Sequence, residues 1–169
     1  GGKHKLKAQL IGSGSILREV EAAAELLADE WKVAATVWSA TSMNELAREG
    51  MSIDRMNRLK PTATKQRSYV AECLDDQPGV VVAATDYIRT YAEQIRPWIK
   101  APYTVLGTDG FGRSDSRERL RSHFEVDRYH VVVATLSTLA DQGEIGFDIV
   151  EKAIKKYNIN ADALNPIKA

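Results

Sequence analysis

The chain has 169 residues, a length that suits one domain with a substantial buried core. Its 23 basic and 23 acidic side chains cancel, and no segment collects enough Lys and Arg to suit a phosphate backbone, which argues against a nucleic-acid partner. The longest apolar run, residues 80–84, is far shorter than the roughly 20 residues that a membrane span requires, and the single cysteine excludes an internal disulfide. We therefore expect a soluble, cytoplasmic protein.

Residues 1–4 are expected to be an expression tag or a cut end without ordered structure, and residues 5–169 to form a single domain. The first strand is predicted over residues 6–11. It ends at a turn of two glycines and two serines, whose hydroxyls can cap the next helix. That helix carries apolar residues three and four apart, as one buried stripe requires, namely Leu17, Val20, Ala24, Leu27 and Trp31.

The middle of the chain continues the alternation of strand and helix. A second strand is predicted over residues 33–40, where β-branched residues are common. Ser42 and Glu45 then form a capping-box pattern, and the helix that they start is expected to end near Gly50. Residues 51–77 are less regular, with a short helix predicted over residues 69–74.

Two further strands are predicted, over residues 80–84 and 103–106. The first of them has no polar alternation, so we expect it to be buried on both faces. Thr85 and Asp86 are expected to cap the intervening helix, which runs towards Trp98.

The last third of the chain is predicted to be helical, over residues 116–124, 129–141 and a final stretch around 149–157. Val131 to Val133 alone would suit a strand, but apolar residues recur there at helical spacing. The whole pattern predicts an α/β fold with three α/β/α layers, a mostly parallel sheet of about five strands and a helical C-terminal third.

The turns that follow the strands are the candidate functional positions, because loops at the carboxyl ends of parallel strands form the usual ligand or partner edge. Asp86 and Ser114 could instead only cap helices, while the glycines permit unusual backbone angles. Gly12-x-Gly14 also invites a nucleotide-binding or anion-binding interpretation, but the third glycine of that fingerprint would fall at Leu17.

Residues suited to catalysis are not apparent in the sequence. Gly-x-Ser-x-Gly is absent, and Cys73 has no histidine nearby in the sequence. His123 and His130 are expected to be separated by a helix break at residues 126–127, and no clustered carboxylates or thiols complete a metal shell. We predict no catalytic, cofactor-binding or metal-binding residue in this chain.

Several segments in the same order resemble the last domain of the homodimeric bacterial pyruvate dehydrogenases, which is transketolase-like. The resemblance covers almost the whole chain. It is most specific in the run Gly-Thr-Asp-Gly-Phe-Gly-Arg-Ser-Asp at residues 107–115, and it continues in residues 10–20, 37–42, 44–48, 84–87 and 124–127. The chain departs from its relatives around residues 60–69, which puts local contacts there in question.

The resemblance implies a parent enzyme of the bacterial cytoplasm that decarboxylates pyruvate and passes the two-carbon unit to the lipoyl group of an acyltransferase component. Thiamine diphosphate and magnesium would be bound by the other domains of that enzyme. The chain itself is then expected to make interdomain and homodimer contacts through its strand-end loops, at Gly12, Ser13, Gly14, Ser15, Thr85, Asp86, Thr108, Asp109, Phe111, Gly112, Arg113 and Ser114. Two alternatives stay open, a parent enzyme for another 2-oxo acid and a stand-alone module that binds an anion or nucleotide.

Overall fold

The computed structural model describes residues 5–110, 112 and 114–168. Its centre is a sheet of four parallel strands in the order β2-β1-β3-β4, formed by β1 (Leu6–Gly12), β2 (Val33–Ser39), β3 (Val80–Ala84) and β4 (Tyr103–Leu106). About five strands were expected, so the described residues form one fewer. The predictions for residues 1–4 lie outside the described residues.

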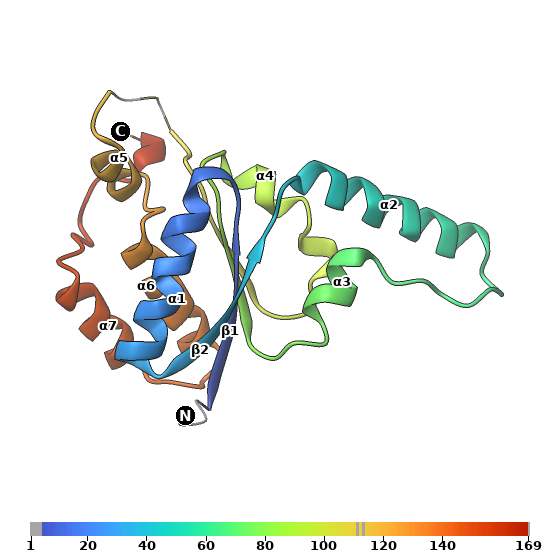
Figure 1. Ribbon diagram of the computed structural model, residues 1–169, viewed down its shortest axis with the longest axis horizontal. Coiled ribbons are helices and arrows are strands. Elements are labelled where there is room, and N and C mark those ends of the chain that lie inside the picture. Colours follow the sequence, from blue (N-terminus) through green and yellow to red (C-terminus); the bar gives the residue numbers. More distant parts are fainter. Residues whose placement is uncertain (1–4, 111, 113, 169) are drawn as a thin grey trace.

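Helices cover both faces of the sheet, as Figure 1 shows. On one face lie α1 (Leu17–Trp31), α6 (Arg128–Asp141) and α7 (Phe147–Lys156), and on the other lie α2 (Met43–Leu59), α3 (Tyr69–Leu74) and α4 (Arg89–Glu93). The remaining elements are α5 (Arg117–His123) and three short 3₁₀ turns, η1 (Gly14–Ile16), η2 (Arg96–Trp98) and η3 (Pro166–Lys168). The predicted three-layer α/β/α architecture is confirmed.

The strand β3 joins the two cores of the domain. Val80, Val82 and Ala84 pack into the core under α1 and α6, whereas Val81 and Ala83 pack into the core under α2 and α4. Because successive side chains of a strand point to opposite faces, a strand that is covered on both sides must be apolar at every position. The predicted burial of this strand on both faces is therefore confirmed.

One buried polar residue, Gln9, is fully satisfied by its neighbours. Its Nε2 donates to the carbonyls of Leu74 and Gln77, each at 3.0 Å, and its Oε1 accepts from Trp38 Nε1 at 3.1 Å. A buried amide without these partners would destabilise the fold, so Gln9 fixes the turn after α3 against β1.

The helix α2 continues to Leu59, and the prediction that it ends near Gly50 was wrong. A Cβ atom on Gly50 would lie 2.4 Å from Cε2 of Trp98, so the glycine makes room for that ring and does not stop the helix. The Trp98 indole also donates to Asp54, one turn further along α2, at 2.9 Å. Glycine inside a helix costs only about 1 kcal/mol, which this packing offsets.

The predicted helix caps had mixed outcomes. Ser42 Oγ accepts from the backbone N–H of Glu45 at 3.2 Å, as predicted, although the Glu45 carboxylate pairs with Arg48. The hydroxyls of the first turn do not cap α1, which follows η1 directly and has no side-chain cap. Thr85 and Asp86 do not cap α4 either, because that helix begins at Arg89 and its first N–H is bound from another loop.

The short helix over residues 69–74 and the two helices predicted over residues 116–124 and 129–141 are confirmed, as is the final helix. Asp127 caps α6 by accepting from the N–H of His130 at 2.9 Å. Among the described residues, no helix is both long enough and apolar enough to cross a membrane.

Candidate interface at the strand ends

The carboxyl ends of three adjacent strands meet at one edge of the sheet. The register pairs Gly12 of β1 with Ala84 of β3, and Ala84 with Leu106 of β4. The turns that follow these residues are therefore neighbours in space, although 72 residues separate the first from the second in the sequence. The predicted convergence of the strand-end turns is confirmed for the residues that the structure describes.

A hydroxyl pair joins the turn after β1 to the turn after β3. Ser13 Oγ donates to Thr85 Oγ1 at 2.8 Å, and both residues are buried. Thr85 Oγ1 also accepts from the backbone N–H of Tyr87 at 3.2 Å. The pair thus satisfies two buried hydroxyls and fixes both turns.

Asp86 closes over the glycine of the first turn. Gly14 has a φ of +58°, a backbone conformation that favours glycine, and a Cβ there would lie 2.9 Å from Asp86 Oδ1. Ser15 Oγ donates to the other carboxylate oxygen of Asp86 at 3.3 Å. A carboxylate against this turn repels a phosphate group, so the geometry disfavours the nucleotide-binding interpretation of Gly12-x-Gly14.

The loop after β4 is bound to the turn after β3 by a second set of contacts. Thr108 Oγ1 donates to the carbonyl of Asp86 at 2.7 Å. Asp109 Oδ1 accepts from the backbone N–H of Arg89 at 3.0 Å, and Asp109 Oδ2 binds the guanidinium of the same residue. Asp109 is therefore the cap that α4 uses, supplied from 20 residues away.

The end of this loop is less tightly held. Gly110 has a φ of +121°, and a Cβ there would lie 2.3 Å from the carbonyl oxygen of Pro166, so the loop packs against η3. Apart from Gly112 itself and its two chain neighbours, no heavy atom of the described residues lies within 4 Å of where a Cβ of Gly112 would be, and Ser114 is exposed. The hydroxyl that caps α5 belongs to Ser116, and not to Ser114. Phe111 and Arg113 lie outside the described residues.

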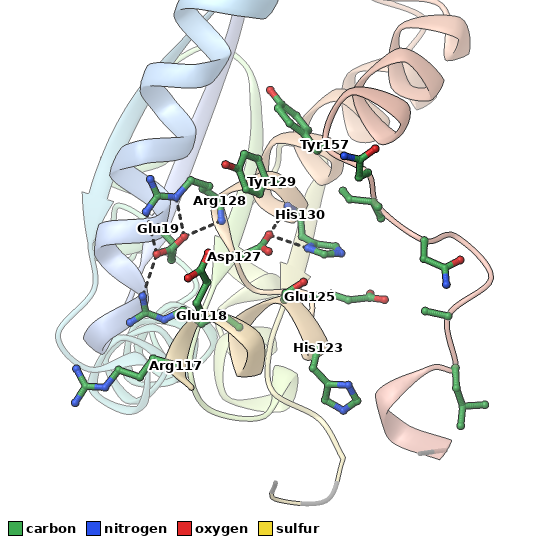
Figure 2. A pocket seen from close by; sticks show the side chains of 17 residues that line it. Glu19, Arg117, Glu118, His123, Glu125, Asp127, Arg128, Tyr129, His130 and Tyr157 are labelled. Carbon is green, nitrogen blue, oxygen red and sulfur yellow. Dashed lines mark hydrogen bonds and ion pairs between the residues drawn. The ribbon is translucent and has the colours of Figure 1, made fainter. Parts of the chain in front are cut away.

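A separate polar cavity of about 820 Å³ opens between α5, α6 and the chain after α7. Figure 2 shows Glu19 of α1 at its inner wall, facing Arg128. The Glu19 carboxylate binds Arg121 at 3.0 Å and Arg128 at 3.1 Å. Burial alone would raise the pKa of Glu19, but the hydrogen bonds and charge of Arg128, with the charge of Arg121, outweigh it and hold the pKa below its ordinary 4.5.

Two other groups that line this cavity, His130 and Tyr157, are also bound by neighbouring side chains. His130 Nδ1 lies 2.8 Å from Asp127 Oδ1, and the ring projects into the cavity in Figure 2. Tyr157 donates to Glu30 at 2.5 Å and accepts from Trp31 Nε1 at 2.8 Å, and burial together with the Glu30 contact raises its pKa to about 12. These contacts connect α1, α6 and α7, so the wall of the cavity stabilises the packing of the three helices.

Comparison with known proteins decides the family. Residues 2–127 match the family described as the transketolase-like TK C-terminal domain. The chain belongs to this family.

Three bacterial relatives of this transketolase-like C-terminal domain are pyruvate dehydrogenase E1 components. The pyruvate dehydrogenase E1 component of Cupriavidus necator is 55% identical over 161 residues, which are 95% of this chain and 18% of the relative. The E1 components of Pseudomonas aeruginosa and Escherichia coli K12 are each 54% identical, over 94% and 96% of the chain and 18% of the relative. The resemblance seen in the sequence is thereby confirmed, and the chain spans about 18% of the length of these curated relatives.

A solved structure shows the same fold at lower identity. The protein titled "Split gene transketolase, inactive beta4 tetramer" aligns with a TM-score of 0.52 and 16% sequence identity, over 79% of this chain and 39% of that one. At this identity the likeness concerns the fold alone.

Two exposed apolar residues at the strand-end edge of this transketolase-like domain were missed by the sequence reasoning. Tyr87 and Ile88 follow Asp86 directly and are 58% and 56% exposed. The sequence predicted a helix that is capped by Thr85 and Asp86, so the two exposed residues were expected to lie in the first turn of that helix. Only the late start of α4, at Arg89, leaves both side chains on the surface.

Proposed function

We propose that this chain is the carboxy-terminal domain of a bacterial pyruvate dehydrogenase E1 component and that its role there is structural. The identity of 55% over 95% of the chain carries the proposal. The parent enzyme would decarboxylate pyruvate in the cytoplasm and transfer the acetyl unit to the lipoyl group of the acyltransferase component.

The strand-end edge is the surface that we assign to contacts with the rest of that enzyme and with its homodimer partner. The side chains of Ser13, Thr85 and Asp109 bind within the edge, so they hold it rigid. Tyr87 and Ile88 then stand exposed on a fixed support. Apolar and aromatic residues on a rigid polar frame are typical of protein interfaces, where tyrosine is enriched.

The donor set of this edge does not fit thiamine diphosphate with magnesium. A diphosphate clamp needs free carboxylate oxygens for the metal. Asp109 is engaged by the N–H and the guanidinium of Arg89, and Asp86 packs against Gly14 and Ser15. We therefore assign the cofactor to other domains of the parent enzyme.

The proposal is tested by comparing the intact parent protein with a version that lacks residues 6–168. The intact protein, supplied with thiamine diphosphate and magnesium, is expected to oxidise pyruvate with ferricyanide and to sediment as a dimer. The truncated version is expected to lose dimerisation and turnover, and the chain alone to turn over no 2-oxo acid.

Two results would contradict the proposal in different ways. If the intact protein prefers a larger 2-oxo acid to pyruvate, the proposed substrate is wrong, but the proposed structural role of this chain stands. Turnover of a 2-oxo acid by the isolated chain, or a fully active dimer without it, would refute the structural role.

A further inference from the structure

The second half of α2 and the loop that follows it form a projection, which we call the arm and define as residues 51–67. Figure 1 shows α2 running outward from the sheet and the chain returning to α3. None of the residues of the arm is buried, whereas Met43, Ala47 and Gly50 in the first half of α2 are. The arm therefore contributes little to the cores of its own domain.

Specific hydrogen bonds nevertheless hold the arm in one shape. The side chain of Asn57 donates to the carbonyl of Gln66 and accepts from its N–H, both at 2.9 Å. The loop adds bonds from Lys60 N–H to the Met56 carbonyl at 3.0 Å and from Ala63 N–H to the Lys60 carbonyl at 3.1 Å. These contacts fasten the returning loop to α2, so the arm presents a defined surface.

The arm is predominantly basic, and its one acidic residue, Asp54, accepts a hydrogen bond from the Trp98 indole. Between residues 55 and 67 the sequence has five basic residues and no acidic one, although the whole chain has 23 basic and 23 acidic residues. Arg67 binds the Ala71 carbonyl at 2.7 Å and pairs with Asp76 at 3.4 Å. The other four basic residues are Arg55, Arg58, Lys60 and Lys65. None of them forms an ion pair with a side chain that the structure describes.

Apolar side chains accompany these cations. Met51 and Leu59 are each 59% exposed, and Tyr69 at the base of the arm is 58% exposed. Met, Tyr and Arg are enriched in protein–protein interfaces, and a surface of one sign selects a partner of the opposite sign. The combination favours an acidic protein surface over a nucleic acid, which would be bound chiefly through phosphate contacts and stacking aromatics.

We infer that the arm docks against an acidic surface in the part of the parent polypeptide that lies outside these residues. The inference rests on the proposed function, since the chain spans 18% of the length of its relatives and leaves ample polypeptide to supply that surface. The partner surface carries Asp and Glu side chains facing Lys60 and Lys65, with apolar positions that receive Met51 and Leu59.

Carbodiimide cross-linking of the intact parent protein tests the inference, because the reagent joins a lysine amine to a carboxylate that it already contacts. Lys60 and Lys65 are expected to cross-link to Asp or Glu residues outside this chain. Arg55→Glu with Arg58→Glu keeps both amines and is expected to lower the cross-link yield at least about fivefold, since like charges then face each other. Lys152→Glu with Lys155→Glu changes the net charge equally on the exposed side of α7 and is expected to leave the yield unchanged.

Hydrogen exchange supplies the second measurement. Amides of residues 60–67 are expected to exchange about tenfold more slowly in the intact parent protein than in the isolated chain, because a docked segment opens less often. Added salt at 0.5 M should reduce this difference in exchange rate between the two proteins, since it screens the attraction between charges that are more than a few ångströms apart.

Cross-links confined to this chain, together with equal exchange in both proteins, would overturn the inference. So would binding of the intact protein to phosphatidylserine vesicles that Arg55→Glu with Arg58→Glu abolishes, without protein cross-links. Neither measurement uses pyruvate. If the intact protein is inactive on pyruvate but its arm still cross-links, the proposed function is refuted and the docking of the arm stands. If the protein is active on pyruvate but gives no cross-links, the docking of the arm is refuted and the proposed function stands.

Discussion

Ser13 donates a 2.8 Å hydrogen bond to Thr85 across 72 residues of sequence, and both hydroxyls are buried where β1 and β3 end. Thr85→Val removes Oγ1, which accepts hydrogen bonds from the Ser13 hydroxyl and from the Tyr87 N–H, so both donors lose this acceptor. We expect a loss of about 1–3 kcal/mol in the free energy of unfolding, measured by urea denaturation of the chain.

Two further variants separate this bond from general effects of the substitution. Thr85→Ser keeps the hydroxyl and should recover most of the loss. Thr90→Val makes the same change at an exposed position of α4 and should alter stability by less than about 0.5 kcal/mol. Equal stabilities of Thr85→Val and the unmodified chain would show that the bond contributes nothing.

Gly50→Ala should destabilise the domain, although alanine is the better helix former. The added Cβ would lie 2.4 Å from Cε2 of Trp98, so the indole ring must move and its bond to Asp54 weakens. Overpacking of this kind costs about 1–3 kcal/mol, against a gain of about 1 kcal/mol in helix propensity. The thermal midpoint of the variant should fall, while Ser52→Ala on the exposed side of the same helix should hold or raise it.

Leu136→Ala should open a cavity beneath α6. The side chain of Leu136 is 1% exposed and lies in the core that α1, α6 and β3 share. We expect a loss of about 2–5 kcal/mol, measured by denaturant unfolding. Leu164→Ala, at a position that is 65% exposed, serves as the matched change and should cost less than about 0.5 kcal/mol. Similar losses from the two variants would contradict the assigned core.

Glu19→Gln should make stability less dependent on pH. The folded-state pKa of Glu19 lies below its ordinary value of 4.5, so its ion pairs contribute fully above about pH 4.5 and are lost as the pH falls through the folded-state pKa. The variant should therefore be less stable than the unmodified chain at pH 7, and the difference should shrink below pH 4.5. Glu21→Gln, an exposed change on the same helix, should show little difference at either pH. A gap that widens in acid would refute the assignment.

Local patterns predicted much of the fold. The strands β3 and β4 could be predicted from their apolar runs, and the helix α6 from its helical spacing of apolar residues. In each case the residues that indicate the element and its burial lie within the element itself. Gly50 was misinterpreted because the group that requires the glycine, Trp98, lies 48 residues further along the chain. The start of α4 was misplaced for the same reason, since its cap is Asp109.

The candidate edge was predictable in outline, and its internal bonds were not. Strand ends can be located from the sequence, and parallel strands bring them together. The sequence does not say that Asp86 turns towards Gly14, or that Tyr87 and Ile88 remain exposed, because both depend on where the neighbouring turns fall. The single-sign charge of residues 55–67 is visible in the sequence, but its meaning depends on α2 extending past Gly50.

The order β2-β1-β3-β4 reverses direction between β1 and β3, the point at which open α/β proteins usually form a crevice for a small molecule. In this domain the Ser13 and Thr85 hydroxyls occupy that point and bind each other. The position where other open α/β proteins bind a ligand is thus filled by the protein's own side chains. Mutations that separate the two turns would therefore be a direct route for creating a small-molecule pocket in this scaffold.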